Sequence, residues 1–482
     1  MAGVALLVLY VIQIQYKRAS TARQHGCGVV AKHRTKEPFA AFDLYMGMAM
    51  EVPSLIALHR RYGDTFLARA WLAQPFILTI APENIRTVNT GKEWGVAPLR
   101  FAGMEYFCGQ GFLTTDGHSS RNLIAPTFAT NNSVNLSFLG SQVDRLLSQM
   151  PADGETVNLQ PLFDQVFLNS SLLFLLGIDP TKNFSDAPSS PAQFLDAFQD
   201  ALFLTMFRIM LGRAWKLVPQ TRYLKACKTT HQYVDYYIGK ALRDADTSCA
   251  TDEDFLKIKP KLSMAHVLAT QTSDQEYIRN QVLQGMMASV ETISALLGNA
   301  CFLLSRHPKY WQQIRDEVSG KDIADLDPDT LLNLKVTRNI LNETLRLYPN
   351  FPLLARVALS NTQLPSGGGP HQDLPVFVPK GTQVVMSYFA LHRNPAVFGD
   401  DVESFRPERW DSVKPGKWEF MGFGGGNRAC LAERKALVEA AYVLVRLAQA
   451  YGGLETRDKR EWKGELKLTC RNAHGCEVAL FT

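Results

Sequence analysis

One helical pattern of more than thirty residues constrains the fold of this chain more than any other feature of its sequence. The pattern begins at Ser273, which has capping-box spacing to Glu276, and it runs to His307, where Pro308 stops it. Its residues are largely apolar, so the sequence predicts a long helix that is buried for most of its length. A helix of this kind indicates a fold that is rich in α structure.

The rest of the 482-residue chain supports a mainly α fold with a small β region. Most of the stretch 135–347 has helical periodicity, whereas residues 66–80 read as a hairpin and residues 468–481 as two short strands. The chain is 46% hydrophobic and 20% charged, which is typical of a globular protein with a large core. No Pro/Gly/Ser-rich linker divides the middle of the sequence, so we expect a single domain over residues 37–482.

Charge and cysteine usage exclude several classes of protein. The formal net charge is only +5 and the basic residues are dispersed, so we expect no nucleic-acid partner. Eight cysteines are present, but none forms a Cys-x-x-Cys pair, so the sequence indicates neither a zinc site nor a disulfide framework. Apart from Cys430, we interpret them as reduced thiols.

The amino terminus carries an apolar run, residues 4–12, followed by basic residues that include Lys17 and Arg18. We predict that residues 1–20 form a membrane anchor and residues 21–36 a basic linker. The run is shorter than the roughly twenty apolar residues that usually cross a bilayer. The charges after it favour a topology that leaves the rest of the chain on the cytosolic face. A cleaved signal peptide and a truncated start are the alternatives.

A glycine-rich loop places one cysteine directly before a strongly helical run, because residues 423–430 read Phe-Gly-Gly-Gly-Asn-Arg-Ala-Cys. Glycines let backbone amides and a flat ligand approach the sulfur. Amide donors, the Arg428 cation and a helix N-terminus all favour the thiolate form of Cys430. Phe423 can shield the sulfur from water, and the Arg428 guanidinium can pair with a carboxylate. These features predict a metal-ligand thiolate; a buried structural cysteine is the alternative.

The centre of the long helix combines small, acidic and hydroxyl side chains. Ala288, Glu291, Thr292 and Ala295 share one face by three- and four-residue spacing. Ala288 leaves room for the edge of a cofactor, and Glu291 is costly to bury in an apolar helix unless it has a use. We therefore interpret Glu291 and Thr292 as catalytic candidates; the alternative is a core helix whose glutamate faces solvent.

A third group of residues lies between these two segments. Glu343 and Arg346 are three positions apart on a helix that Pro349 ends, so they can pair on one face. The stretch around them is apolar, and a buried ion pair needs further hydrogen-bond partners.

These segments, in this order, resemble the cytochrome P450 family. Its haem-binding signature, Phe-x-x-Gly-x-Arg-x-Cys-x-Gly, is matched at every position but the last, where Ala432 stands. The resemblance implies haem b with Cys430 as the axial thiolate ligand of the iron, and Phe423 and Arg428 as further haem-binding residues.

The same resemblance assigns roles to the two upstream segments. The P450 helix that crosses the distal haem face carries an Ala/Gly-Gly-x-Asp/Glu-Thr element, whose acid and alcohol handle the water and protons of dioxygen activation. Glu291 and Thr292 match those two positions, and Ser289 replaces the usual glycine. The family also pairs its Glu-x-x-Arg motif with a downstream Pro-Glu-Arg arginine, which implies a structural triad of Glu343, Arg346 and Arg409.

Two further arginines are assigned by the resemblance alone. Arg356 and Arg121 are implied to contact the haem propionates; the alternative for Arg356 is an ordinary arginine on a strand surface. The family helix that carries the second arginine usually reads Trp-x-x-x-Arg after an Asp-Gly turn. Here residues 116–121 read Asp-Gly-His-Ser-Ser-Arg, so the tryptophan is missing and His118 is its candidate substitute.

Within the family, the resemblance is to the fungal n-alkane and fatty-acid hydroxylases. The segments that carry it are residues 25–27, 364–370, 378–381, 388–394 and 405–410. The candidate pocket residues are apolar, which permits a lipophilic substrate without defining its chain length or the position of attack. They are Phe101 to Phe112, Phe198, Phe203, Phe207, Phe351, Leu353 and Leu354.

The activity that this resemblance implies is hydroxylation of an unactivated C–H bond of a fatty acid, alkane or lipid-like metabolite, with dioxygen as co-substrate. The chain has no flavin or nicotinamide motif, so its electrons must come from a separate protein. The family implies NADPH-cytochrome P450 reductase of the endoplasmic reticulum membrane, with cytochrome b5 as a further candidate. Arg434 and Lys435 are candidate exposed contacts for an acidic reductase surface.

Two other classes of function stay open at this point. A haem-thiolate isomerase or dehydratase would act without a reductase, and it has less need of Glu291 and Thr292. A catalytically impaired haem-binding homologue would account for Ser289, Ala432 and the missing tryptophan together.

Overall fold

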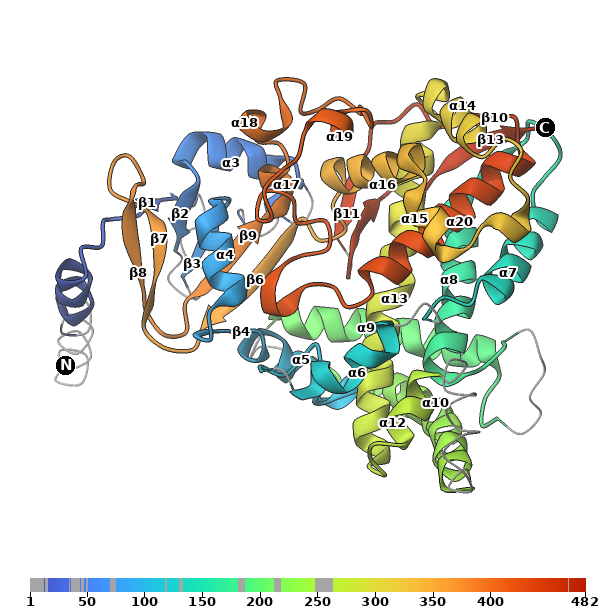
Figure 1. Ribbon diagram of the computed structural model, residues 1–482. Coiled ribbons are helices and arrows are strands. Elements are labelled where there is room, and N and C mark those ends of the chain that lie inside the picture. The colour runs from blue at the N-terminus through green and yellow to red at the C-terminus, as the bar shows by residue number, and fades with distance from the viewer. Residues whose placement is uncertain are drawn as a thin grey trace. The chain divides into compact units, whose positions relative to one another are not determined.

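The computed structural model groups the chain into two compact units (Figure 1). Unit 1 comprises residues 1–96, 351–404 and 413–429, and unit 2 comprises residues 97–350, 405–412 and 430–482. The residues that the structure describes are 13, 16–33, 35, 44, 47–48, 51–69, 75–117, 119–129, 133–180, 187–211, 218–247, 263–466 and 468–482.

The predicted membrane anchor falls mostly on residues 1–12 and is therefore largely outside the described residues, as is His118. Residues 16–24, which follow the apolar run, are helical. The anchor, the basic linker and the single domain over residues 37–482 stay predictions.

Unit 1 is built on a mixed six-stranded sheet with the strand order β1-β2-β3-β9-β6-β4. The pairs β1–β2 and β3–β9 are parallel, and the other neighbours are antiparallel. A separate hairpin is formed by β7 and β8. The bounds in unit 1 are β1 (Ala31–Lys32), α3 (Ser54–Tyr62), β2 (Thr65–Ala68), β3 (Phe76–Thr79), α4 (Pro82–Thr90), β4 (Trp94–Gly95), β6 (Leu353–Ala358), β7 (Thr362–Gly368), β8 (Leu374–Val378), β9 (Gln383–Ser387), α17 (Tyr388–Leu391), α18 (Pro395–Phe398) and η5 (Gly426–Arg428).

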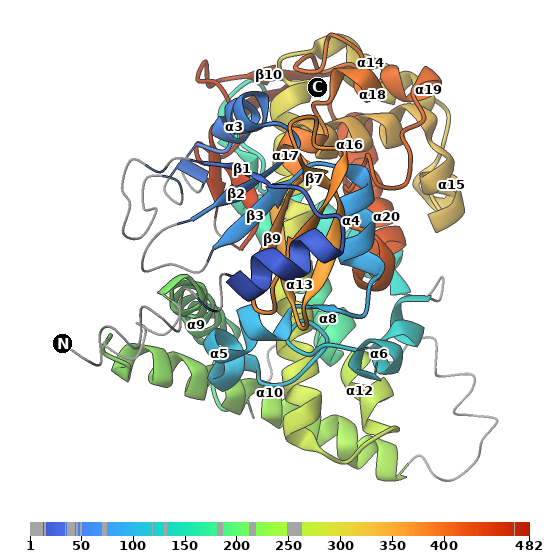
Figure 2. The same cartoon turned by 90° about the vertical axis from the view of Figure 1, so that its left-hand side faces the viewer.

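The core of unit 1 lies between this sheet and α4, which runs beside β3 and β9 in Figure 2. Ile85 and Val88 of α4 pack with Ile77 of β3 and with Val384 and Met386 of β9, and all five are buried. The helix also contacts η5, the short turn within the glycine loop. The strand core of unit 1 therefore fixes the helix against which the glycine loop lies.

Unit 2 is predominantly helical, with a three-stranded antiparallel sheet in the order β10-β13-β5 and a hairpin of β11 and β12. Its bounds are α5 (Ala97–Cys108), α6 (Ser119–Ala129), α7 (Leu136–Ser148), β5 (Thr156–Asn158), α8 (Leu159–Leu176), α9 (Pro191–Leu211), α10 (Thr221–Thr247), α12 (Met264–Ala269), α13 (Gln275–Leu304), α14 (Pro308–Glu317), η4 (Ile323–Asp325), α15 (Pro328–Asn333), α16 (Lys335–Leu347), α19 (Arg409–Ser412), α20 (Glu433–Ala450), β10 (Gly453–Thr456), β11 (Gly464–Leu466), β12 (Cys470–Asn472) and β13 (Glu477–Phe481).

The long predicted helix is α13, the central element of unit 2 (Figure 1). It contacts α5, α8, α10, α12, α16 and α20. Its N-cap is Asp274, whose side chain accepts from the backbone N–H of Tyr277, so the helix begins one residue later than a cap at Ser273 would place it. By length and composition α8 and α13 could each span a membrane, yet both are mostly buried in the protein, as core helices are.

These elements confirm the predicted mainly α fold with a small β region. The hairpin expected over residues 66–80 is the antiparallel pair β2–β3. The two strands expected over residues 468–481 are β12 and β13, and they belong to different sheets because β12 pairs with β11 and β13 with β10 and β5.

Candidate active site

Cys430 lies in unit 2, directly before the first turn of α20. The residue is exposed, and the backbone N–H of Ala432 donates to its sulfur. Protein packed around the sulfur disfavours the charged form, and this loss of solvation raises the pKa of the Cys430 thiol. The Ala432 amide and the Arg121 charge act in the opposite direction, and the nearby Glu433 carboxylate adds to the increase.

This balance differs from the sequence-based expectation. The donors that favour a thiolate are present at Cys430, but the loss of solvation outweighs them, and the net shift of the thiol pKa is upward. Metal binding to a cysteine requires its thiolate form.

The set of donors around Cys430 fits haem. Among the described residues, no group of three or more His, Cys, Asp or Glu side chains is arranged to hold a bare metal ion. A single sulfur with a backbone amide aimed at it suits an iron whose remaining ligands belong to a porphyrin.

In unit 1, the glycine loop is fastened to the end of α4. The side-chain amide of Asn427 donates to the carbonyl oxygen of Thr90 at 3.1 Å. Gly426 has a φ of +64°, and a Cβ at this position would lie only 2.4 Å from the carbonyl oxygen of Asn89. A side chain at residue 426 is therefore excluded both by the backbone conformation and by its neighbour.

We expect Gly426→Ala to weaken the loop more than Gly424→Ala. Gly424 also has a positive φ, +71°, but its Cβ would meet nothing closer than the Arg428 carbonyl oxygen at 3.7 Å. The Gly424 change should cost about 1 kcal/mol of unfolding free energy, and the Gly426 change roughly 1–3 kcal/mol more, because a backbone atom has to move. Urea unfolding of the two variants, with haem content measured in parallel, checks this difference; equal midpoints would contradict it.

Arg356 is buried at 5% exposure on β6, so the alternative of an ordinary strand-surface arginine is wrong. Its Nη2 donates to Oδ1 of Asn89 at 3.2 Å, and its Nη1 to the carbonyl oxygen of Ala355 at 2.9 Å. The side chain of Asn89 thus holds Arg356, while its carbonyl group abuts Gly426. Unit 1 therefore brings Arg356 together with the glycine loop, in which Phe423 and Arg428 are both partly buried.

In unit 2, the burial of α13 is interrupted at its centre. Residues 281–287 and 293–304 are buried, whereas Ala288 is exposed and residues 289–292 are partly exposed. The Thr292 hydroxyl donates to the carbonyl oxygen of Ala288 at 2.8 Å, a back-bond that locally weakens the helical ladder. Ala288 and Thr292 thus lie on an exposed or partly exposed stretch of an otherwise buried helix. A small residue and a hydroxyl at such a place fit the distal side of a flat cofactor.

Glu291 is partly buried, and its carboxylate is directed toward the carboxy-terminal part of unit 2. The Thr469 hydroxyl lies 3.5 Å from Oε2 of Glu291, the outer limit of a hydrogen bond. Two positions earlier, the hydroxyl of Ser289 is buried and has no hydrogen-bond partner among the described atoms. Glu291 is thus partly buried beside Thr469, and its role stays a prediction.

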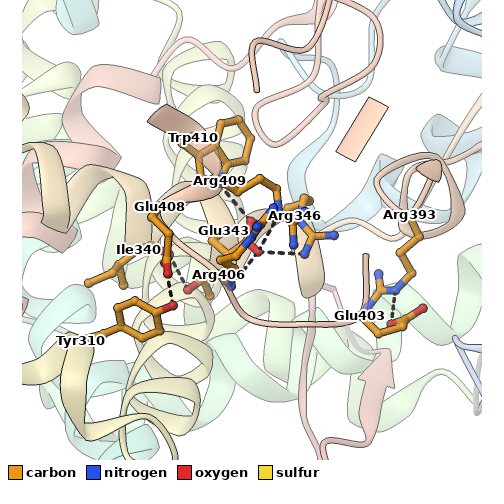
Figure 3. A network of polar contacts seen from close by, with 11 residues as sticks. Tyr310, Ile340, Glu343, Arg346, Arg393, Glu403, Arg406, Glu408, Arg409 and Trp410 are labelled. Atoms are coloured by element: carbon orange, nitrogen blue, oxygen red, sulfur yellow. Dashed lines mark hydrogen bonds and ion pairs between the residues drawn. The ribbon is translucent and has the colours of Figure 1, made fainter. Parts of the chain in front are cut away.

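Glu343, Arg346 and Arg409 come together in unit 2, and all three are fully buried (Figure 3). Arg346 donates from Nε to Oε2 of Glu343 at 2.9 Å and from Nη2 to Oε1 at 2.8 Å. Arg409 donates from Nε to Oε1 at 3.3 Å. One carboxylate thus accepts from two guanidinium groups in the interior, and a buried ion pair requires further hydrogen bonds of this kind.

The sequence analysis missed two further donors to Glu343. The indole Nε1 of Trp410 donates to Oε2 at 3.0 Å, and the backbone N–H of Arg406 donates to Oε1 at 3.0 Å. Beside them, the Tyr310 hydroxyl donates to Oε2 of Glu408 at 2.6 Å (Figure 3). A tryptophan directly after the Pro-Glu-Arg segment was the signal that could have predicted the indole contact.

The two basic residues predicted at the start of α20 have different surroundings. Lys435 is buried and forms an ion pair with Glu439, which also accepts from the Ser170 hydroxyl, so its prediction as an exposed contact is wrong. The Glu439 carboxylate of α20, which Ser170 of α8 also contacts, balances the charge of Lys435. Arg434 is partly exposed and pairs with Asp329 at 2.7 Å.

The predicted pocket residues differ in exposure. Phe107, Phe112 and Phe198 are buried, and Phe203 and Phe207 of α9 are 66% and 42% exposed. In unit 1, residues 351, 353 and 354 are partly buried.

Comparison with known proteins identifies the family. Residues 42–466 match the cytochrome P450 family. The chain is 32% identical to cytochrome P450 monooxygenase apdE of Emericella nidulans, with 95% of this chain and 90% of the relative covered. It is 36% identical to cytochrome P450 monooxygenase himC of Aspergillus japonicus (88% and 78% covered) and 33% identical to cytochrome P450 52E2 of Candida apicola (82% and 79% covered).

A match over most of the chain and three relatives above 30% identity agree with the mainly α fold and with the exposed Cys430 before α20. The family as a whole implies a haem with a cysteine thiolate ligand, dioxygen as co-substrate and a redox partner. The chain belongs to the cytochrome P450 family and is an oxidoreductase of the monooxygenase class.

Proposed function

We propose that Cys430 is the axial haem ligand of a monooxygenase that hydroxylates an unactivated C–H bond of a lipophilic substrate. The observation that carries this proposal is the position of Cys430, an exposed residue directly before α20 whose sulfur accepts from the Ala432 amide. Arg121 of the same unit is close enough to lower the pKa of that thiol, and we assign it to a haem propionate. In unit 1, Phe423, Arg428 and the buried Arg356 are assigned as haem contacts from their match to the family's motifs.

When bound, the haem supplies the iron at which dioxygen is activated with two electrons. The residues of α13 handle the protons. A hydroxyl has one hydrogen to donate and two lone pairs that accept. The Thr292 hydroxyl donates its hydrogen to the Ala288 carbonyl oxygen. Thr292 therefore has to rotate away from Ala288 before it donates toward the haem side. Glu291, with Thr469 beside its carboxylate, is proposed to resupply these protons.

We propose the substrate class from the apolar character of unit 2. Its hydrophobic core cluster contains Phe107, Phe112, Phe198 and Met287. Surroundings of this composition suit a fatty acid, an alkane or a lipid-like metabolite such as a polyketide, and they offer little to a polar ligand.

Electrons are proposed to come from NADPH-cytochrome P450 reductase, with cytochrome b5 as a second donor. We place the protein on the endoplasmic reticulum membrane, held by residues 1–20, with the catalytic part in the cytosol. The apolar run and the basic residues after it support this placement. On the exposed side, Arg434 remains a candidate reductase contact, although its pairing with Asp329 already partly satisfies its charge.

The reduced carbon monoxide difference spectrum tests the proposal. We expect the thiolate-type Soret shift, followed by reductase-dependent hydroxylation of fatty acids or alkanes. If the shift is absent, the monooxygenase proposal fails. If the shift is present but the protein rearranges a peroxide without a reductase, the isomerase or dehydratase alternative is correct. If the shift is present without any turnover, the protein is a catalytically impaired haem binder.

Replacing Thr292 with alanine is expected to uncouple turnover. NADPH consumption should continue while hydroxylated product falls by about a hundredfold and hydrogen peroxide rises, because a positioned proton donor has been removed. Thr292→Ser keeps the hydroxyl and serves as the matched control, with coupling close to that of the unchanged protein. Product and peroxide are measured per NADPH consumed, and unchanged coupling in the alanine variant would remove Thr292 from the proton relay.

A further inference from the structure

In unit 2, residues 108–115 comprise the last residue of α5 and the stretch that leads toward α6. The side chain of Gln284 on α13 contacts both ends of this segment. The amide of Gln284 donates from Nε2 to the carbonyl oxygens of Cys108 at 2.8 Å and Gly109 at 3.2 Å, and to the hydroxyl of Thr114 at 3.1 Å. Its Oε1 accepts from the backbone N–H of Leu113 at 2.7 Å. A single buried amide therefore satisfies groups at both ends of a non-helical segment.

A second glutamine of α13 reinforces this contact. The Oε1 atom of Gln281 accepts from the backbone N–H of Phe112 at 3.2 Å. Both glutamines are fully buried. The approach is close, because a Cβ at Gly111 would lie 2.6 Å from Nε2 of Gln284. The segment is thus fitted to the glutamine side chains and cannot shift toward α13 without a clash.

The clamp, which we define as Gln284 together with segment 108–115, lies next to the partly exposed stretch 288–292 at the centre of α13. Gln284 precedes Ala288 by four residues, so the two share one face and are separated by about 6 Å along the helix. One residue earlier than Ala288, the sulfur of Met287 lies 3.9 Å from that of Cys108. Segment 108–115 therefore runs beside the exposed stretch at Ala288, on the side toward the start of α13.

We infer that Gln284 is a positioning residue that holds segment 108–115 as one wall of the substrate space beside Ala288, and thereby determines which bulky ligands and which C–H bonds reach the haem. This inference rests on the proposed function. Gln284 acts through the segment and touches neither cofactor nor substrate. Removing its amide takes the acceptor from the Leu113 N–H and one donor from each of three acceptors, of which Gly109 and Thr114 keep other partners. A buried group that loses its partner moves until it finds another or water.

The test uses Gln284→Met, which keeps the length of the side chain and removes its hydrogen bonds. Gln142→Met is the matched control, because Gln142 on α7 is buried and accepts from Asn169 but has no contact with segment 108–115. Binding of imidazole and of phenylimidazole to the ferric haem is titrated for both variants by absorbance. The affinity for imidazole depends on access to the iron alone. The affinity for phenylimidazole also depends on the position of segment 108–115.

We expect Gln284→Met to change the affinity for phenylimidazole by about tenfold while that for imidazole stays constant. With dodecanoic acid and n-dodecane, the ratio of hydroxylation positions should shift, and the Soret band and the coupling should not. Hydrogen exchange at the Leu113 and Phe112 amides should become faster. Gln142→Met should leave all of these unchanged.

The inference is overturned if both ligand affinities and the product positions stay as in the unchanged protein, even when exchange at Leu113 accelerates. It is equally overturned if Gln142→Met produces the same ligand selectivity change, because the effect would then be general softening of the core. A protein that lacks the thiolate-type Soret shift refutes the proposed function instead. If the shift is present but neither probe is hydroxylated, the substrate proposal fails, and the ratio of the two imidazole affinities still decides the role of Gln284.

Discussion

Cys430→Ala is expected to abolish the thiolate-type Soret shift of the reduced carbon monoxide complex and all hydroxylation. Cys430 supplies the sulfur at the end of the glycine loop. Without it, the Ala432 amide would lose its acceptor. Loss should be complete rather than graded, because no neighbouring side chain can replace a thiolate on the iron. Absorbance spectra and haem content of the purified variant measure it.

Cys27→Ala is the matched control for this experiment. Cys27 is also a partly exposed thiol, and it lies far from Cys430 in the sequence. Its replacement should leave the spectrum unchanged. A Soret shift that survives in the Cys430 variant would show that the ligand is another residue, and the assignment of the glycine loop would have to be withdrawn.

Glu343→Gln is expected to prevent stable folding. The two carboxylate oxygens of Glu343 accept from Arg346, Arg409, Trp410 and the backbone of Arg406, all within 3.3 Å. The amide has the same shape but no charge, so two fully buried guanidinium groups would lose their counter-ion. Breaking a buried pair in this way costs roughly 3–5 kcal/mol, which is a large part of the 5–15 kcal/mol that typically holds a domain folded.

Urea unfolding and the yield of soluble, haem-containing protein measure this loss. Glu408→Gln is the control: this carboxylate lies in the same segment, binds the Tyr310 hydroxyl and Lys309, and has a side chain that is 51% exposed. Its change should cost no more than about 1 kcal/mol. If Glu343→Gln unfolded at the same urea concentration as Glu408→Gln, the buried network would not be a principal stabilising element of unit 2.

The local features of the fold could be predicted from the sequence. The start of α13 follows from its capping pattern, and the observed cap differs from the expected one by a single residue. Its end was predicted at His307, but the helix ends at Leu304. The Glu343–Arg346 contact also follows from spacing, because residues three apart on a helix face each other. In each case the determining residues lie within one or two helical turns.

What the sequence did not predict depends on distant packing. Lys435 looked like a surface residue of α20, but it is buried beside the Glu439 carboxylate one turn away. That carboxylate also accepts from Ser170 of α8. The pKa of Cys430 was expected to fall, and burial by the surrounding protein raises it instead. The clamp joins residues 176 positions apart, and no local periodicity distinguishes Gln284 from any other glutamine on an apolar helix.

The fastening of the glycine loop has a consequence for the order in which the protein assembles. The loop is secured by the carbonyl groups of Asn89 and Thr90, and the Asn427–Thr90 bond spans 337 positions of the chain. Contacts of such long range form late in folding, since closing a large loop of chain costs entropy before any contact rewards it. The helix α4 and its strand neighbours must therefore be in place first. Loading of the cofactor onto the loop is then a closing step of maturation, and a weakened α4 should show itself as slow haem uptake in a chain whose helices have already formed.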